Sequence, residues 1–178
     1  MRLVLFSGLP GVGKTTVSNS VGKLIDAVTV DIDDFKRNSV DGKLVKSQID
    51  PPEIRWGYYQ KALSHVLELF NSGAKRIILD EVFHLSSLRS KIEGFCAENG
   101  VKVVWVEVLC DYKVVEGRLN SVKREGHLLS TQEALSMHLM FKEIFESFPF
   151  CSRNHIVVDN ERGVDCESLS KRILDITL

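Results

Sequence analysis

Residues 8–15 read Gly-Leu-Pro-Gly-Val-Gly-Lys-Thr, and this stretch decides the fold of the chain. It matches the pattern G-x-x-x-x-G-K-[ST], whose glycines let the backbone curl so that successive N–H groups face the phosphates of a nucleotide. The apolar run Leu3 to Ser7 precedes it, and a helical pattern over Lys14 to Ile25 follows it. A strand before and a helix after are the context that the motif requires, so the sequence predicts a phosphate-binding loop (P-loop).

The P-loop also predicts where ATP and Mg²⁺ bind. Lys14 is expected to reach the β- and γ-phosphates as a catalytic cation, Thr15 to bind Mg²⁺, and Thr16 to lie on the α-phosphate side. A glycine turn that only joined a strand to a helix would not need the adjacent lysine and threonine. The residues expected to bind ATP are Gly8, Leu9, Pro10, Gly11, Val12, Gly13, Lys14, Thr15 and Thr16.

Further apolar runs predict the rest of the fold. Four of them are rich in β-branched residues and separated by helical patterns: Ala27 to Val30, Arg76 to Asp80, Val101 to Leu109 and His155 to Asp159. Alternating strands and helices predict a single-domain α/β P-loop NTPase fold over residues 1–178, with a five-stranded parallel sheet and helices on both faces.

Two segments have the composition of helix starts. Asp50-Pro51-Pro52-Glu53 combines an Asp cap with prolines in the first turn, so we expect a helix to begin there and to continue to about residue 72. Ser130-Thr131-Gln132-Glu133 predicts a capping box at the beginning of a helix that runs to about Phe145.

The composition bounds the class of protein. The chain has 178 residues, 44% of them hydrophobic, and a formal net charge of −1, which gives no basis for binding nucleic acid or an anionic membrane. The four cysteines form no C-x-x-C pattern, so we expect no disulfide framework and no zinc site. Residues 1–6 lack the length and the cleavage site of a signal peptide, which favours a cytoplasmic location.

Acidic residues follow the second predicted strand, in Asp31-Ile32-Asp33-Asp34. Because the carboxyl ends of parallel strands face the ligand crevice, Asp33 is our candidate for the general base that accepts a proton from an attacking hydroxyl. Alternation would place Asp31 and Asp33 on one side of an extended segment. The alternative is that these residues only cap a short helix. Lys36 and Arg37 are candidates to hold an anionic acceptor, or are solvated.

The third predicted strand ends in Asp80-Glu81. Asp80 is expected to hold Mg²⁺ through water. Many ATPases use the glutamate of such a pair to polarise water, so Glu81 favours a nucleotide-hydrolysing regulatory module. Alternatively, Glu81 faces the acceptor, together with Phe83 and His84.

Two polar windows predict mobile segments over the site, a substrate segment at about 36–50 and a lid at about 118–130. Arg118 and Arg124 are the candidate catalytic cations of the lid, because their donors could close on the charge that develops during transfer. The alternative of a solvated helix face carries nearly equal weight.

Longer stretches of the sequence resemble those of a known family. They are residues 73–83 (Gly-Ala-Lys-Arg-Ile-Ile-Leu-Asp-Glu-Val-Phe), residues 104–111 (Val-Trp-Val-Glu-Val-Leu-Cys-Asp) and residues 115–118 (Val-Glu-Gly-Arg). His138 and the closing segment 156–168 add to the likeness. The chain resembles the chloramphenicol phosphotransferase-like P-loop kinases, within the wider group that includes zeta toxins and polynucleotide 5′-kinases.

The resemblance implies an ATP-dependent O-phosphotransferase with a five-stranded parallel sheet, and it implies that Asp33 is the base. Two features depart from the antibiotic enzyme. The P-loop is closer to those of general kinases and polynucleotide kinases than to a serine-rich loop, and the lid lacks the R-G-D-R spacing.

We therefore expect a kinase that uses Mg²⁺ and ATP to phosphorylate a hydroxyl of a small molecule, in the manner of chloramphenicol 3-O-phosphotransferase. Three alternatives stay open: a nucleoside or polynucleotide 5′-kinase, the regulatory ATPase module, and a toxin-like kinase acting on a cell-wall nucleotide sugar. A polynucleotide kinase would need exposed aromatic rings, for which Trp56, Tyr58 and Tyr59 are the candidates. The sequence does not indicate an oligomeric state or the identity of the acceptor.

Overall fold

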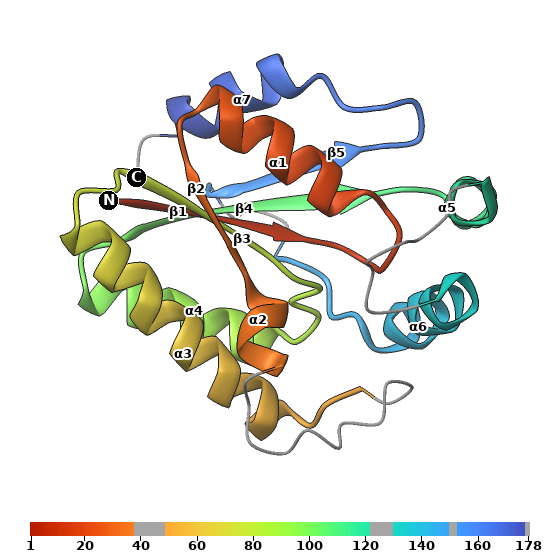
Figure 1. Cartoon of the computed structure of the whole chain (residues 1–178), viewed down its shortest axis with the longest axis horizontal. Coiled ribbons are helices and arrows are strands. Elements are labelled where there is room, and N and C mark those ends of the chain that lie inside the picture. Colours follow the sequence, from red (N-terminus) through yellow and green to blue (C-terminus); the bar gives the residue numbers. More distant parts are fainter. Residues whose placement is uncertain (38–48, 122–129, 150–152, 177–178) are drawn as a thin grey trace.

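A five-stranded parallel sheet runs through the centre of the computed structural model of the chain (Figure 1). The structure describes residues 1–37, 49–121, 130–149 and 153–176. The strands are β1 (Arg2–Ser7), β2 (Val28–Asp31), β3 (Arg76–Asp80), β4 (Lys102–Leu109) and β5 (His155–Asp159). Their order in the sheet is β2-β3-β1-β4-β5, and all neighbours are parallel. The predicted α/β fold with a five-stranded parallel sheet is confirmed.

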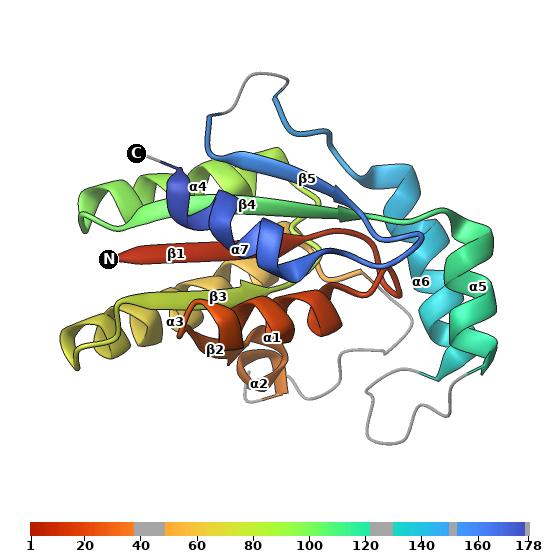
Figure 2. The same ribbon diagram turned by 90° about the horizontal axis from the view of Figure 1, so that it is seen from above.

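Helices cover both faces of the sheet. The described helices are α1 (Lys14–Leu24), α2 (Ile32–Arg37), α3 (Pro52–Asn71), α4 (Ser86–Glu98), α5 (Tyr112–Ser121), α6 (Thr131–Ile144) and α7 (Cys166–Asp175). Helices α1 and α7 lie on one face and α3 and α4 on the other, while α5 and α6 lie beyond the carboxyl ends of the strands (Figures 1 and 2). In the described ranges, no helix has the length and apolar character needed to cross a membrane.

Strand β1 is apolar on both sides because it lies between two helical layers. Leu3 and Leu5 pack in the core that faces α3 and α4, whereas Val4 and Phe6 pack in the core that faces α1 and α7. All four side chains are fully buried. Burial of each such side chain stabilises the fold by roughly 1.5–3 kcal/mol. The middle strand of the sheet is thereby fixed, and the P-loop follows directly at its carboxyl end.

Both predicted helix starts are confirmed, but the expected Asp50 cap at the first of them is wrong. The Ser130 hydroxyl accepts a hydrogen bond from the backbone N–H of Glu133, and the Glu133 carboxylate accepts one from the N–H of Ser130, which forms the capping box at α6. At α3, by contrast, Pro51 occupies the N-cap position and no side chain caps the helix. Asp50 lies one residue too early for the expected cap, and its carboxylate instead accepts a hydrogen bond from the Tyr58 hydroxyl (3.3 Å).

The loop between β3 and α4 is tied to the segment that follows α6. The backbone N–H of Glu146 donates to the carbonyl of His84 (2.9 Å), and the Glu146 carboxylate accepts from the backbone N–H of Ser86 (2.6 Å). The Arg89 guanidinium donates to the carbonyls of Phe83 (2.8 Å) and Glu146 (2.7 Å). Phe83 has a left-handed backbone (φ +48°), and a side chain with Cβ adopts this conformation only where its surroundings enforce it. These contacts enforce it, and they fix the loop that leads out of β3.

His84 is a buried imidazole within this loop. Its side chain is 2% exposed and packs edge-on against Phe141 of α6, with 4.9 Å between the ring centroids. Burial, followed by the nearby Arg55 cation, lowers the pKa of His84 to about 4. The folded protein therefore holds this ring neutral at neutral pH.

Replacing His84 should change how stability depends on pH. A histidine with a lowered pKa takes up its proton less readily in the folded chain than in the unfolded chain. The free energy of unfolding is therefore highest above pH 6.5, where both states are neutral at this ring, and it declines as the pH falls towards 4. Over this window we expect wild type to lose roughly 1–3 kcal/mol more unfolding free energy than His84→Gln. Urea denaturation across the window measures this. Equal slopes for wild type and His84→Gln would contradict the assignment.

Candidate functional site

The P-loop fits its surroundings so closely that two of its glycines have no room for a side chain. A Cβ atom at Gly8 would lie 2.4 Å from the carbonyl oxygen of Val108 in β4. A Cβ atom at Gly13 would lie 2.5 Å from Nδ2 of Asn160, and the backbone there is left-handed (φ +91°). Glycine is required at both positions for these reasons. The structure thus gives a physical cause for the spacing of the motif.

Two side chains hold the P-loop from outside. Nδ2 of Asn160, directly after β5, donates to the carbonyl of Val12 (2.8 Å). Nδ1 of His138, on α6, contacts the carbonyl of Pro10 (2.8 Å), and since a carbonyl can only accept, this nitrogen carries the hydrogen. The sequence signal for His138 is the family resemblance. Asn160 was missed, because no local pattern distinguishes it from any other polar residue after a strand.

Lys14, Thr15 and Asp80 come together beneath the P-loop. The Lys14 ammonium donates to the carbonyl of Leu9 (3.1 Å), and burial lowers its pKa although Asp80 and Glu81 oppose that shift. Burial raises the pKa of Asp80, against the effects of Lys14 and of a hydrogen bond from Thr15. A hydroxyl and a carboxylate in contact are the oxygen ligands that Mg²⁺ prefers beside nucleotide phosphates. The donor set therefore fits the predicted magnesium site.

Asp33 lies on a helix rather than on an extended segment. Strand β2 ends at Asp31 and α2 begins at Ile32, where the Asp31 carboxylate accepts the backbone N–H of Asp33 (2.8 Å). The expectation that Asp31 and Asp33 share one side of a strand is wrong, and the capping alternative holds for Asp31. The three-residue helical spacing brings Lys36 Nζ to 3.0 Å from Asp33 Oδ1. The Asp33 side chain stays 38% exposed.

Glu81 joins two cations in the interior of the site. Its Oε2 lies 2.5 Å from Lys36 Nζ and its Oε1 lies 3.3 Å from Arg55 Nη1, while its side chain is 6% exposed. Burial alone would raise the pKa of Glu81, but Lys36 and Arg55 outweigh burial and lower it to about 2. Glu81 in turn raises the pKa of both cations, against the opposite effect of burial. We call Asp33, Lys36, Arg55 and Glu81 the charge quartet.

The charge quartet bears on two alternatives from the sequence. A glutamate that polarises water must accept a proton, and Glu81 is already bound to two cations and is a very weak base. The presence of Glu81 beside Asp80 favoured a hydrolytic module, and its ion pairs with Lys36 and Arg55 explain that presence without hydrolysis. Tyr58 and Tyr59 are each only 1% exposed, so these two rings belong to the core and form no exposed surface for stacking bases.

Arg55 was not predicted as a site residue. It lies on α3 among aromatic residues, and its side chain is 3% exposed. The guanidinium also lies over the ring of Phe141 on α6, 5.1 Å from the centroid, and its Nε donates to the carbonyl of Asp50 (3.2 Å). An arginine within an otherwise buried helical face was the available signal, because a buried cation requires a partner.

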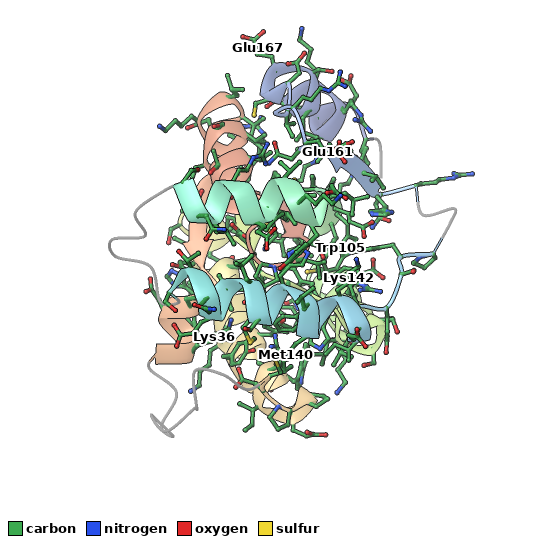
Figure 3. The ribbon with its side chains drawn as sticks, turned by 90° about the vertical axis from the view of Figure 1, so that its right-hand side faces the viewer. Lys36, Trp105, Met140, Lys142, Glu161 and Glu167 are labelled. Carbon is green, nitrogen blue, oxygen red and sulfur yellow. The ribbon has the colours of Figure 1, made fainter. Side chains whose placement is uncertain are left out.

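Arg118 lies on the other side of the P-loop from the charge quartet. Its Nη2 donates to the carbonyls of Asn160 (2.7 Å) and Glu161 (2.9 Å), and its Nη1 approaches the Cys110 sulfur (3.6 Å). Figure 3 shows Lys36 beyond α6 and Glu161 beyond α5, on opposite sides of this pair of helices. In the described chain Arg118 therefore supports Asn160, which holds the P-loop.

The other lid candidate, Arg124, lies outside the described residues. So do most of the substrate segment predicted at 36–50 and most of the lid predicted at 118–130. Thr16 is exposed near the beginning of α1, next to Thr15.

Several solved structures share the fold. A sugar kinase from Janibacter sp. HTCC2649 matches with a TM-score of 0.73 and 21% identity, over 99% of this chain and 96% of that one. A gluconokinase from Sinorhizobium meliloti 1021 matches with a TM-score of 0.66 and 15% identity, over 98% and 90%. The Mycobacterium tuberculosis APS kinase in complex with AMPPNP and APS matches with a TM-score of 0.64 and 17% identity, over 98% and 96%. At these identities the likeness establishes the fold, which is that of the P-loop kinases.

Sequence comparison assigns the family. No curated protein sequence matches the chain. The family described as AAA domain matches residues 3–140, from β1 into α6. Because this match spans more than half of the chain, the protein belongs to the AAA domain family.

Proposed function

We propose that the protein is a kinase that uses ATP and Mg²⁺ to phosphorylate a hydroxyl group of a small molecule. One observation carries this proposal: the partly exposed Asp33 carboxylate lies close enough to the P-loop lysine, Lys14, for their charges to interact. The charges of Lys36 and Glu81 act on Lys14 as well. A nucleotide site that faces a carboxylate able to take a proton is the arrangement that phosphoryl transfer needs. The solved structures that share the fold are described as kinases of small molecules, which supports the proposal.

On the nucleotide side, the P-loop and Lys14 would bind the phosphates of ATP. Thr15 and Asp80 would hold Mg²⁺, which when bound offsets the negative charge of the β- and γ-phosphates. Lys14 lies half-buried beside Asp80, so its ammonium would act in a poorly hydrated environment. Electrostatic interactions are stronger there than in water.

On the acceptor side, Asp33 would act on the attacking hydroxyl. As the acceptor oxygen forms its bond to the γ-phosphorus, the bond from that phosphorus to the bridging oxygen of ADP breaks, and the hydroxyl proton passes to Asp33. Lys36 fixes the position of this carboxylate through the 3.0 Å contact. Catalysis on this scheme comes mainly from positioning and charge stabilisation.

Different roles are proposed for Arg118, as a positioning residue, and for Arg124, as a catalytic cation. Arg118 would act on the nucleotide through the loop after β5, which holds the P-loop. Arg124 would act from the lid. The resemblance to chloramphenicol phosphotransferases supports a hydroxyl acceptor, and we propose that class of acceptor without proposing chloramphenicol itself.

Replacing Asp33 with Asn should abolish transfer and spare ATP binding, because the amide keeps the shape of the side chain but cannot take the proton. We expect kcat for transfer to fall by about 10²–10⁴-fold. Mass spectrometry of the phosphorylated acceptor measures transfer, and calorimetry measures ATP binding. Asp34→Asn, the same change on the next residue of α2, is the control and should leave both unchanged. Normal transfer by Asp33→Asn would refute the proposed base.

Replacing Gly13 with Ala should weaken ATP binding by roughly tenfold or more, because the methyl group would meet Asn160 in a backbone conformation that disfavours it. Gly57→Ala on α3 is the matched control, since a Cβ atom there meets nothing within 4 Å. Titration with ATP by calorimetry compares the two variants. Wild-type affinity in Gly13→Ala would show that the loop adapts and that its fit to Asn160 is unimportant.

A further inference from the structure

The charge quartet has no net charge. Lys36 and Arg55 contribute two positive charges, and Asp33 and Glu81 contribute two negative ones. The contacts are 3.0 Å for Lys36 with Asp33, 2.5 Å for Lys36 with Glu81, and 3.3 Å for Arg55 with Glu81. Each cation therefore already has a carboxylate partner from the protein itself.

Burial makes this pairing difficult for a ligand to replace. The side chains of Arg55 and Glu81 are 3% and 6% exposed. An anionic acceptor that bound Arg55 would have to displace the buried Glu81 carboxylate from it. An acceptor carboxylate near Lys36 would in addition be repelled by both Asp33 and Glu81. Within the charge quartet, the two cations that could attract an anion are thus already neutralised.

The exposed members of the quartet suit hydroxyl groups instead. The Asp33 and Lys36 side chains are 38% and 22% exposed, and they present an oxygen acceptor and a nitrogen donor 3.0 Å apart. One hydroxyl can donate to Asp33, where it would lose its proton, while a neighbouring hydroxyl of the same molecule accepts from Lys36. Two adjacent hydroxyls on an uncharged carbon skeleton provide this pattern.

We infer that Glu81 determines the charge class of the acceptor: by neutralising Lys36 and Arg55 it adapts the site to an uncharged polyol with neighbouring hydroxyls, and against acceptors that carry a carboxylate. The inference rests on the proposed kinase function and narrows its substrate. Glu81 is on this view a specificity-determining residue that acts through the two cations and does not touch the transferred phosphoryl group.

Pairs of acceptors that differ at one terminal carbon, a CH2OH group in the polyol and a carboxylate in the acid, test this inference. Suitable pairs are D-glucitol with D-gluconate, ribitol with D-ribonate, and glycerol with D-glycerate. Wild-type protein with Mg²⁺ and ATP is expected to phosphorylate the polyol of a pair with a kcat/KM about tenfold or more above that of its acid partner. Preference for the acid in wild type, or transfer to no polyol at all, would overturn the inference.

Variants of the quartet change its net charge in defined steps. Glu81→Gln leaves one excess positive charge and should shift the polyol-to-acid ratio about tenfold or more towards the acid. Arg55→Gln leaves one excess negative charge and should shift the ratio the other way. The double variant Glu81→Gln with Arg55→Gln restores neutrality and should retain the wild-type preference. Glu53→Gln removes an exposed charge from the same helix as Arg55 and is the control that should leave the ratio unchanged.

Thermal melts check that each variant is folded, because Glu81→Gln leaves Arg55 buried without its carboxylate. If that variant does not fold, Arg55→Gln and the double variant still decide the question. A ratio that does not follow the net charge of the quartet would overturn the inference.

Failure of this inference is distinguishable from failure of the proposed function. Nucleosides and amphenicols are included among the acceptors for this purpose. Phosphorylation of any of these, with none of a polyol, keeps the kinase and removes the polyol. ATP hydrolysis that no hydroxyl compound stimulates, with no phosphorylated product, removes both.

Discussion

A single buried carboxylate holds the acceptor side of this protein in place. Transferring Glu81 out of water costs several kcal/mol, and the fold recovers that cost only if Lys36 and Arg55 lie against it. Those two cations come from α2 and α3, so the positions of both helices against β3 depend on the same interaction. Removing one partner would leave an uncompensated charge in the interior, and the packing of α2 and α3 against the end of β3 would be destabilised together.

The two halves of the site are stabilised by different means. The P-loop is a backbone structure, and its shape is kept by steric contacts and by side chains that hold its carbonyls from outside, Asn160 and His138. The acceptor side is built from charged side chains and kept by electrostatics. Asp80, the last residue of β3, belongs to the nucleotide half, and Glu81, the next residue, belongs to the acceptor half. Strand β3 therefore connects the nucleotide to the acceptor through two consecutive residues.

Sequence patterns predicted the parts of the fold that depend on local chemistry. The bounds of β3 and β5 were predicted to the residue, because apolar β-branched runs end abruptly in acid. The P-loop and the Ser130 capping box follow from residue spacing in the same way. Arg55 and Asn160 could not be predicted as members of the site, since each acts on a partner distant in the sequence. The two wrong expectations, at Asp31 with Asp33 and at Asp50, both concern the residue at which a helix begins, which local composition does not determine.

The abrupt junction at Asp31 and Ile32 also affects association between chains. Strand β2 lies at the edge of the sheet, and an edge strand exposes backbone N–H and C=O groups that can pair with another molecule. Because the chain turns directly into α2, this edge is only four residues long. A longer strand would offer a template for intermolecular β-pairing and aggregation. The turn into α2, which brings Asp33 towards the P-loop, therefore also limits the number of unpaired backbone groups that β2 offers to another chain.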